Sequence, residues 1–253
     1  MSQMNRIYIL AGQSWADGQP NNLSGLPVEY NGVYLHTNRI WGGTNFEPIY
    51  STDNNNQYPV ARRTGGGSIE FKFKDIADYL GSDVYILKVA QGSTRLEFDV
   101  TRTDWNVASV GELYDNLVTE IAAVEAWMTA RGKSFEWAGV IWLQGEGDSV
   151  SESAALAYQT NLQNFYDGLC VATSTTLKFW QYNIIMPPSE NREFLTTINS
   201  KKADFTALDT TNRKLYTPII TGWNADDIHP SLPTGYFDEL WDNHQYQLII
   251  DEL

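Results

Sequence analysis

Four short runs of apolar residues, rich in β-branched and aromatic side chains, occur along the chain. They lie at residues 7–10, 84–89, 137–143 and 177–185. Uninterrupted apolar runs of this length are typical of strands that are buried on both faces of a sheet. The pattern therefore predicts four buried strands.

Between and after these runs, apolar residues recur at the spacing of an amphipathic α-helix. This pattern covers residues 69–80, 113–128, 154–169 and 235–250, and Ser68 is a suitable N-cap for the first of these helices. Strands that alternate with helices form right-handed crossovers and a largely parallel sheet that is covered on both faces. We therefore expect an α/β fold.

The polar segment at residues 21–67 interrupts this alternation. It is rich in Asn, Gly and Tyr and shows no clear periodicity. Loops of this length inside a compact domain are uncommon and are often functional. We interpret the segment as a loop excursion over the ligand-binding edge of the sheet, with room for a short hairpin. We expect a single domain over residues 1–253.

Polar triplets follow three of the predicted strands without a spacer. They are Gly12-Gln13-Ser14, Gln91-Gly92-Ser93 and Gln144-Gly145-Glu146. In open α/β sheets, ligands bind beyond the carboxyl ends of the strands, so these triplets should meet at one edge. The sequence therefore predicts a site at this edge, although a serine after a strand can also serve only to cap the next turn.

A serine nucleophile needs a base, a group that orients the base, and donors for the oxyanion. Of the three histidines, His36 lies in the polar excursion and His244 lies within the last helical pattern. His229 follows Asp226 by three residues in a turn-prone stretch. An Asp at that distance can fold back onto the imidazole Nδ1 and leave Nε2 to face a hydroxyl. The candidates for nucleophile, base and orienting group are thus Ser14, His229 and Asp226.

Composition narrows the range of partners. The chain has 17 Lys and Arg against 31 Asp and Glu, a formal net charge of −14. Nucleic acids and anionic membranes bind clustered basic residues, so this balance argues against both as partners. Cys170 is the single cysteine, which excludes an intramolecular disulfide and metal sites built on several thiolates.

The sequence gives little information on localisation. No stretch approaches the roughly 20 apolar residues of a membrane helix, and the N-terminal residues lack the basic and apolar regions of a signal peptide. Three locations are compatible with these observations: the cytoplasm, a virion, and the exterior of the cell after export by a route that the given sequence does not indicate. The oligomeric state is not indicated.

Three motifs carry a resemblance to a known family. They are "AGQSWADG", "WLQGEGDS" and "DDIHPSLPTGY", and in this order they resemble the sialate-O-acetylesterase-like branch of the SGNH hydrolases, which includes acetylxylan esterases. The resemblance spans residues 7 to about 241, almost the whole chain. It implies a flavodoxin-like, three-layer α/β/α sandwich with a mainly parallel sheet. It also implies Ser14 as nucleophile, His229 as base and Asp226 as the partner of the base.

The same resemblance extends to the oxyanion donors. The family's "HQGE" stretch matches residues 143–146, which implies that Gln144 points its side-chain amide at the oxyanion. Glu146 would then support the histidine beside or instead of Asp226. The family's glycine-bearing second block matches "GGSIEF" at residues 66–71 of this chain. The resemblance therefore implies that the backbone N–H of Gly66, or of the neighbouring Gly67, is an oxyanion donor together with the backbone N–H of Ser14.

The chain departs from the family pattern beside these residues. Trp15 replaces the asparagine of the usual "GQSN", Leu143 replaces the histidine of "HQGE", and Gly147 stands where wider SGNH enzymes carry an oxyanion asparagine. We expect the change at Trp15 to reshape the substrate pocket. The residues expected to contact substrate are Gln13, Trp15, Gly92, Ser93, Thr94 and Arg95.

The resemblance implies a serine esterase that removes O-acetyl groups from a carbohydrate through an acetyl-enzyme intermediate, without a cofactor or metal. One alternative for the carboxylates is a cation site formed by Glu146, Asp148 and Asp226, because hard ions favour such oxygens. Alternatives for the whole protein are a glycan-binding module of a phage tail or surface adhesin, and a lipid esterase or thioesterase of the same fold.

Overall fold

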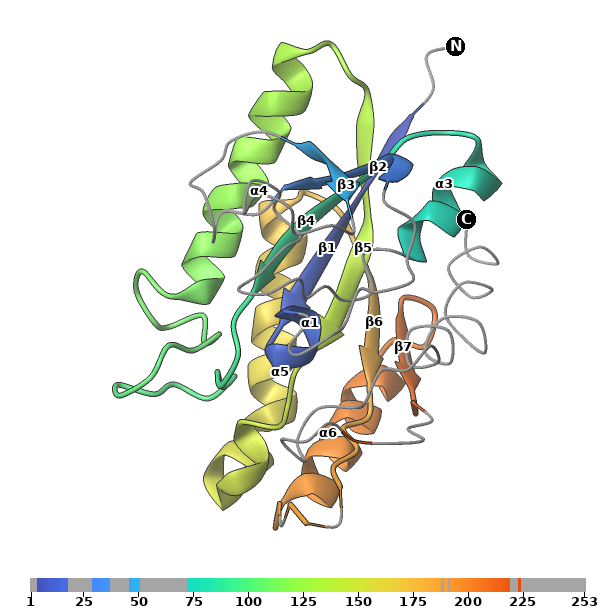
Figure 1. Ribbon diagram of the computed structural model, residues 1–253. Coiled ribbons are helices and arrows are strands. Elements are labelled where there is room, and N and C mark those ends of the chain that lie inside the picture. Colours follow the sequence, from blue (N-terminus) through green and yellow to red (C-terminus); the bar gives the residue numbers. More distant parts are fainter. Residues whose placement is uncertain are drawn as a thin grey trace.

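The computed structural model describes residues 4–17, 29–36, 46–50, 72–187, 189–190, 192–218 and 223. Within them, seven strands form one sheet in the order β3-β2-β4-β1-β5-β6-β7 (Figure 1). The strands are β1 (Asn5–Gly12), β2 (Glu29–His36), β3 (Glu47–Tyr50), β4 (Val84–Ala90), β5 (Phe135–Leu143), β6 (Lys178–Tyr182) and β7 (Arg213–Tyr216). The helices are α1 (Ser14–Asp17), α3 (Phe73–Leu80), α4 (Leu113–Ala130), α5 (Glu152–Ala172) and α6 (Leu195–Ala207), with a 3₁₀ turn η2 (Asp148–Val150).

The sheet is mainly parallel, as predicted. Strand β1 lies in its interior and pairs in parallel with β4 on one side and β5 on the other. The pairs β2–β4, β5–β6 and β6–β7 are also parallel, whereas β3 pairs with β2 in the antiparallel direction. Parallel neighbours end at the same edge, so the carboxyl ends of β4, β1 and β5 lie next to one another.

Helices cover both faces of the sheet. Successive residues of β1 alternate between two hydrophobic cores, since Ile7 and Ile9 face α4 and α5 whereas Tyr8 and Leu10 face α3. This is the period-two arrangement expected of a strand buried on both sides. The predicted three-layer α/β/α sandwich is confirmed.

The predicted central elements correspond closely to the observed ones. The four apolar runs lie in β1, β4, β5 and β6, and the helical patterns at residues 113–128 and 154–169 lie in α4 and α5. Strand β6 ends at Tyr182, before the predicted residue 185, because the side chain of Asn199 takes over the hydrogen bonds of Ile184. Asn199 accepts from the Ile184 N–H at 2.8 Å and donates to the Ile184 carbonyl at 2.9 Å.

Other elements differ from the prediction. Helix α3 begins at Phe73 with Lys72 as N-cap, and the predicted start at Ser68 and the helix at residues 235–250 lie outside the described residues. The segment expected to be a loop excursion with room for a short hairpin contributes the antiparallel pair β2 and β3, and β2 also pairs in parallel with β4. Helix α6 and strand β7 were not predicted at all. Single-domain organisation stays a prediction.

Candidate active site

Three polar segments meet at the carboxyl edge of the sheet. Gly12 pairs with Ala90 of β4 and with Leu143 of β5. Beyond these pairs, the Gln13 N–H donates to the Leu143 carbonyl at 2.9 Å, and the Gln91 N–H donates to the Gly12 carbonyl at 3.1 Å. The convergence expected from the sequence is therefore present.

Gly12 is required for this close approach. Its φ is +144°, and a Cβ added there would lie 2.1 Å from the carbonyl oxygen of Leu143. Any other residue would clash with the backbone of β5 and would be strained at this φ. The close contact between Gly12 and β5 thus fixes the end of β1, and Ser14 follows two residues later.

Ser14 opens α1 and is 8% exposed. It lines a cavity of about 390 Å³. The cavity is lined by Gln13, Ser14, Gly92, Ser93, Arg95, Arg102, Glu146, Gly147, Val150 and Arg192. The structure therefore brings together six residues that the sequence suggested, namely Gln13, Ser14, Gly92, Ser93, Arg95 and Glu146. It adds Arg102, Val150 and Arg192, which the sequence did not suggest for the site, and Gly147, which the sequence comparison had placed at the position of an oxyanion asparagine.

Glu146 is a buried carboxylate in this cavity. Its side chain is 4% exposed, and neither carboxylate oxygen has a hydrogen-bond partner in the part of the chain that the structure describes. Burial raises the pKa of Glu146 above its usual range, while its own backbone N–H, Lys202 and Arg192 act in the opposite direction. A buried carboxylate that keeps its acceptor capacity beside a candidate nucleophile can receive a hydrogen bond from a base or a substrate.

Gln144 does not line the cavity, so the oxyanion role suggested by the family resemblance stays a prediction. Its side chain is fully buried. Its amide donates to the carboxylate of Asp148 and, at 3.4 Å, to the carbonyl of Thr94, and its oxygen accepts from the hydroxyl of Tyr158 at 2.9 Å. Because the amide is already committed to these protein acceptors, this geometry supports Gln144 as part of the frame behind the site.

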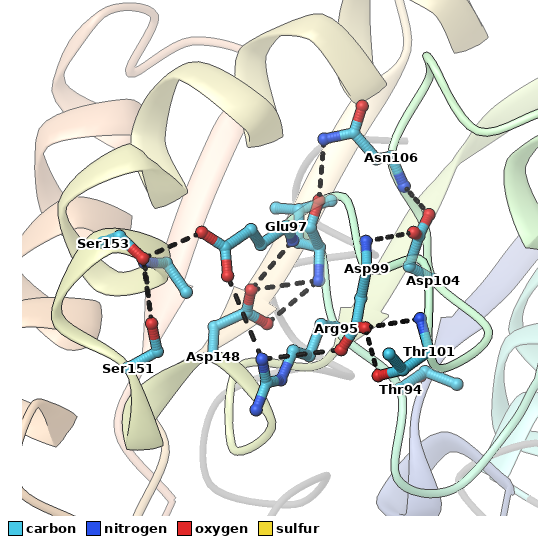
Figure 2. A network of polar contacts seen from close by, with 12 residues as sticks. Thr94, Arg95, Glu97, Asp99, Thr101, Asp104, Asn106, Asp148, Ser151 and Ser153 are labelled. Atoms are coloured by element: carbon cyan, nitrogen blue, oxygen red, sulfur yellow. Dashed lines mark hydrogen bonds and ion pairs between the residues drawn. The ribbon is translucent and has the colours of Figure 1, made fainter.

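Asp148 anchors the segment that follows β4. Its carboxylate accepts from the backbone N–H of Leu96 at 3.0 Å and of Glu97 at 2.9 Å, as Figure 2 shows. Burial raises the pKa of Asp148 to about 6, although these hydrogen bonds and that of Gln144 lower it. The same segment carries Arg95, so Asp148 fixes one wall of the cavity.

Two residues expected to contact substrate are part of the core. Thr94 is 1% exposed, and its hydroxyl donates to the Gln91 carbonyl at 2.8 Å and accepts from the indole N–H of Trp105 at 3.1 Å. Trp15 is buried in the hydrophobic core on the α3 side of the sheet. Neither side chain lines the cavity, because α1 turns Trp15 back toward the sheet. The predicted reshaping of the pocket by Trp15 therefore lacks support.

Three arginines give the cavity a positive lining. Arg95 lies 3.5 Å from Asp99 and 4.0 Å from Glu97 (Figure 2), and Arg192 lies 3.1 Å from Glu190. The Nε atoms of Arg95 and Arg192 are buried and have no hydrogen-bond partner among the described residues. Arg102 is exposed at the same cavity. The guanidinium groups of these residues place positive charge at the cavity, where it favours an anionic or strongly polar ligand.

Several expected site residues lie outside the described residues. These are Gly66, Gly67, Asp226 and His229. Within the described ranges, no group of three or more His, Cys, Asp or Glu side chains is arranged to hold a metal ion. The cation site proposed for Glu146, Asp148 and Asp226 therefore stays untested, because Asp226 is not described.

A search for membrane spans gives a negative result. None of the helices described is both long enough and apolar enough to cross a bilayer.

Most of the chain matches a known protein family. A family model described as carbohydrate esterase, sialic acid-specific acetylesterase, matches residues 4–231. The chain belongs to this family. The carbohydrate esterase branch predicted from the three motifs is therefore confirmed, and this family member is a hydrolase that acts on carbohydrate esters. A search of curated protein sequences finds no match.

Solved structures share the fold of this esterase. A protein from Arabidopsis thaliana has a TM-score of 0.69 at 17% identity, over 98% of this chain and 95% of its own. A carbohydrate acetylesterase from Xanthomonas citri has a TM-score of 0.60 at 16% identity over 92% of this chain, which spans only 53% of that enzyme. NanS has a TM-score of 0.57 at 15% identity, over 92% of this chain and 84% of its own. At these identities the likeness establishes the SGNH hydrolase fold.

Proposed function

We propose that this protein is a serine esterase that removes O-acetyl groups from a carbohydrate through an acetyl-enzyme intermediate. The observation that carries the proposal is the placement of Ser14 at the carboxyl edge of the sheet, in one cavity with the buried carboxylate of Glu146. Membership of an acetylesterase family supports the acetyl group as the acyl unit. Ser14 follows a rigid buried strand, which suits a group that must be held in a narrow range of positions.

In the proposed mechanism, Ser14 Oγ attacks the acetyl carbonyl and gives its proton to His229. The backbone N–H groups of Ser14 and Gly66 stabilise the oxyanion. The C–O bond to the sugar then breaks, and the sugar oxygen takes the proton from His229. Water, deprotonated by the same histidine, attacks the acetyl-enzyme and releases acetate and free Ser14. The scheme uses no cofactor.

Two carboxylates compete for the role of orienting His229. Asp226 has the favourable sequence spacing, whereas Glu146 has a buried carboxylate that lines the cavity. We expect Asp226→Asn or Glu146→Gln, whichever removes the partner of the base, to lower kcat for acetate release by about 10³–10⁴-fold. The other replacement should cost less than about tenfold. Negligible losses in both variants would contradict a carboxylate-oriented histidine.

The rival function is a glycan-binding module in which the fold persists without catalysis. A fluorophosphonate labels only an activated serine, so labelling of Ser14 together with acetate release from a panel of acetylated glycans supports the esterase. Binding of the same glycans without labelling would establish the binding module. Labelling without release from any sugar ester would point to a lipid esterase or thioesterase.

The lining of the cavity favours an acidic sugar as substrate. The family description names sialic acid, which carries a carboxylate, and Arg95, Arg102 and Arg192 supply cations at the cavity of a chain with a net charge of −14. Hydrogen bonds to a charged group contribute about 1.5–3 kcal/mol each. An O-acetylated acidic sugar is therefore the substrate class that we propose.

This substrate class can be tested at Arg192. Arg192→Gln should raise KM for an acetylated acidic sugar by about 10-fold or more, since a charge-assisted hydrogen bond is lost, and should change KM for p-nitrophenyl acetate much less. Arg131→Gln is the matched control, because Arg131 stacks on the ring of Trp127 at the end of α4, before β5 begins. Equal changes for the acidic and the neutral substrate would contradict recognition of the acid group by Arg192.

A further inference from the structure

A fully buried lysine lies behind the cavity. Lys202 of α6 has 0% exposure, and its Nζ donates to the carbonyls of Gln144 and Tyr182, each at 2.6 Å. Gln144 directly follows β5, and Tyr182 is the last residue of β6. One ammonium group therefore joins the carboxyl ends of two neighbouring strands at the edge that carries the candidate site.

The same side chain packs against the turn that leads to Glu146. Gly145 has a φ of +142°, and a Cβ added there would lie 3.3 Å from Cε of Lys202 and 3.0 Å from Cγ2 of Ile198. Helix α6 is thus in direct contact with the backbone one residue before Glu146. Another residue at position 145 would be strained at this φ and would crowd the side chains of Ile198 and Lys202.

The charge of Lys202 is unusual in its surroundings. Within the described part of the chain it makes no ion pair shorter than 4 Å, and besides the two carbonyls its Nζ lies 5.8 Å from the ring centroid of Tyr158. Taking an ammonium group out of water costs several kcal/mol unless it is compensated. A methionine of similar size would avoid this cost, but it would leave the carbonyls of Gln144 and Tyr182 without this donor.

The titratable groups around Lys202 come from the segment after β5, the segment before α6, and α5. Burial lowers the pKa of Lys202 to about 7, although Glu146 and Asp148, which follow β5, favour its charged form. Arg192, which precedes α6, donates to the Glu146 carbonyl at 3.4 Å and also favours an ionised Glu146. Tyr158 of α5 stays neutral, because burial raises its pKa well above its usual range. Lys202 and Glu146 thus stabilise each other's charge.

We propose that Lys202 is a positioning residue of the active site. Its two backbone hydrogen bonds hold the strand ends on either side of the turn at residues 144–146, and its ammonium group lies directly behind this turn, which carries Glu146 into the cavity. The inference rests on the proposed function, in which Glu146 lines the cavity with Ser14 and is one of the two candidates to orient His229. Lys202 itself does not line the cavity, so it acts through Glu146.

The test is Lys202→Met, followed over pH by two measurements. The first is kcat/KM for p-nitrophenyl acetate, and the second is the ¹³C shift of the Glu146 carboxyl carbon, assigned by its loss in Glu146→Gln. Removal of the positive charge favours the neutral acid, so the acid limb of kcat/KM and the Glu146 titration should move together to higher pH. Below the wild-type limb, activity then falls about tenfold for each pH unit of that shift.

Lys201→Met is the matched control. Lys201 is the preceding residue on the same helix, is partly exposed, and pairs with Asp204 at 3.6 Å. This replacement removes an equal charge from the surface of α6, where water screens it. We expect no shift in either measurement. A shift of equal size in both variants would overturn the proposal, because it would show a general effect of net charge.

The carboxyl measurement separates this proposal from the proposed function. If folded Lys202→Met leaves the Glu146 titration unchanged, the positioning role is overturned, whatever the activity. If wild-type protein releases no acetate but the Glu146 titration shifts, the proposed function fails and the electrostatic link stands. Should Lys202→Met not fold, the reciprocal effect is measured in Glu146→Gln. There the Cε resonance of Lys202 should titrate at lower pH than in the wild type, and an unchanged titration overturns the proposal.

Discussion

Replacement of Ser14 by alanine is expected to lower kcat for an acetylated sugar by about 10⁴-fold or more, with little change in stability. The alanine removes the only atom that forms the covalent bond to the acetyl group in the proposed mechanism. It leaves the register of β1 intact, because the close contact that sets this register is made by Gly12. The measurement is acetate release under single-turnover and steady-state conditions, with the melting temperature as a check on folding.

A second hydroxyl makes this experiment more demanding. Ser93 also lines the cavity and has a positive φ of 62°, so it is the rival nucleophile among the described residues. Ser93→Ala should lower kcat by less than about tenfold. Ser82→Ala, which lies before β4 at the opposite edge of the sheet, should behave as the wild type. A larger loss for Ser93→Ala than for Ser14→Ala would overturn the assignment of the nucleophile.

Replacement of Asp148 by alanine should lower the free energy of unfolding by about 3 kcal/mol, the largest stability effect that we expect. The variant leaves three buried donors without their acceptor, namely the N–H groups of Leu96 and Glu97 and the amide of Gln144. Each unsatisfied buried polar group costs about 1–3 kcal/mol, and relaxation or entry of water offsets part of the sum. Urea denaturation gives the change directly.

Asp148→Asn is the matched comparison. It keeps the shape of the side chain and one acceptor oxygen, but it places an NH₂ group against donors. We expect about half the loss seen with alanine. Both variants should also raise KM, because the anchored segment carries Arg95. Unchanged stability in Asp148→Ala would show that the hydrogen bonds of Asp148, part of the network in Figure 2, contribute little to folding.

The central sheet and the meeting of its polar ends could be predicted because they follow from local rules. Buried parallel strands appear as continuous apolar runs, and the carboxyl ends of such strands share one edge. Ser14 and Glu146 could therefore be placed near each other before any coordinates were known. The same rules could not define the strands β2 and β3, because their residues lie in a polar stretch without periodicity.

Helix α6 was missed for a physical reason that concerns the site. The residues it buries are Ile198, Lys202 and Phe205, so a lysine occupies a position where the helical pattern requires an apolar residue. The buried Lys202 behind the cavity therefore interrupts the apolar pattern by which this helix could have been predicted. A charged residue at a core position is thus the signal that could have drawn attention to Lys202.

Side-chain direction is the part of the site that could not be predicted from the sequence. The side-chain amide of Gln144 has the right chemistry to bind an oxyanion. Its direction, however, is set by hydrogen bonds with Asp148 in the 3₁₀ turn η2 and with Tyr158 in α5. Arg102 and Arg192 lie on irregular segments outside any motif, so only the folded chain brings them to the cavity. Residue type could be predicted to matter, whereas orientation required the tertiary structure.

The contact between Gly12 and the carbonyl of Leu143 constrains how this enzyme can diversify. Position 12 is closed to every residue with a side chain, so inheritance must preserve the strand end that carries Ser14. The arginines that line the cavity lie instead on the segments after β4 and before α6, where substitution leaves that strand pair undisturbed. Substitutions in those segments can therefore change the charge of the cavity without moving the strand end that carries Ser14.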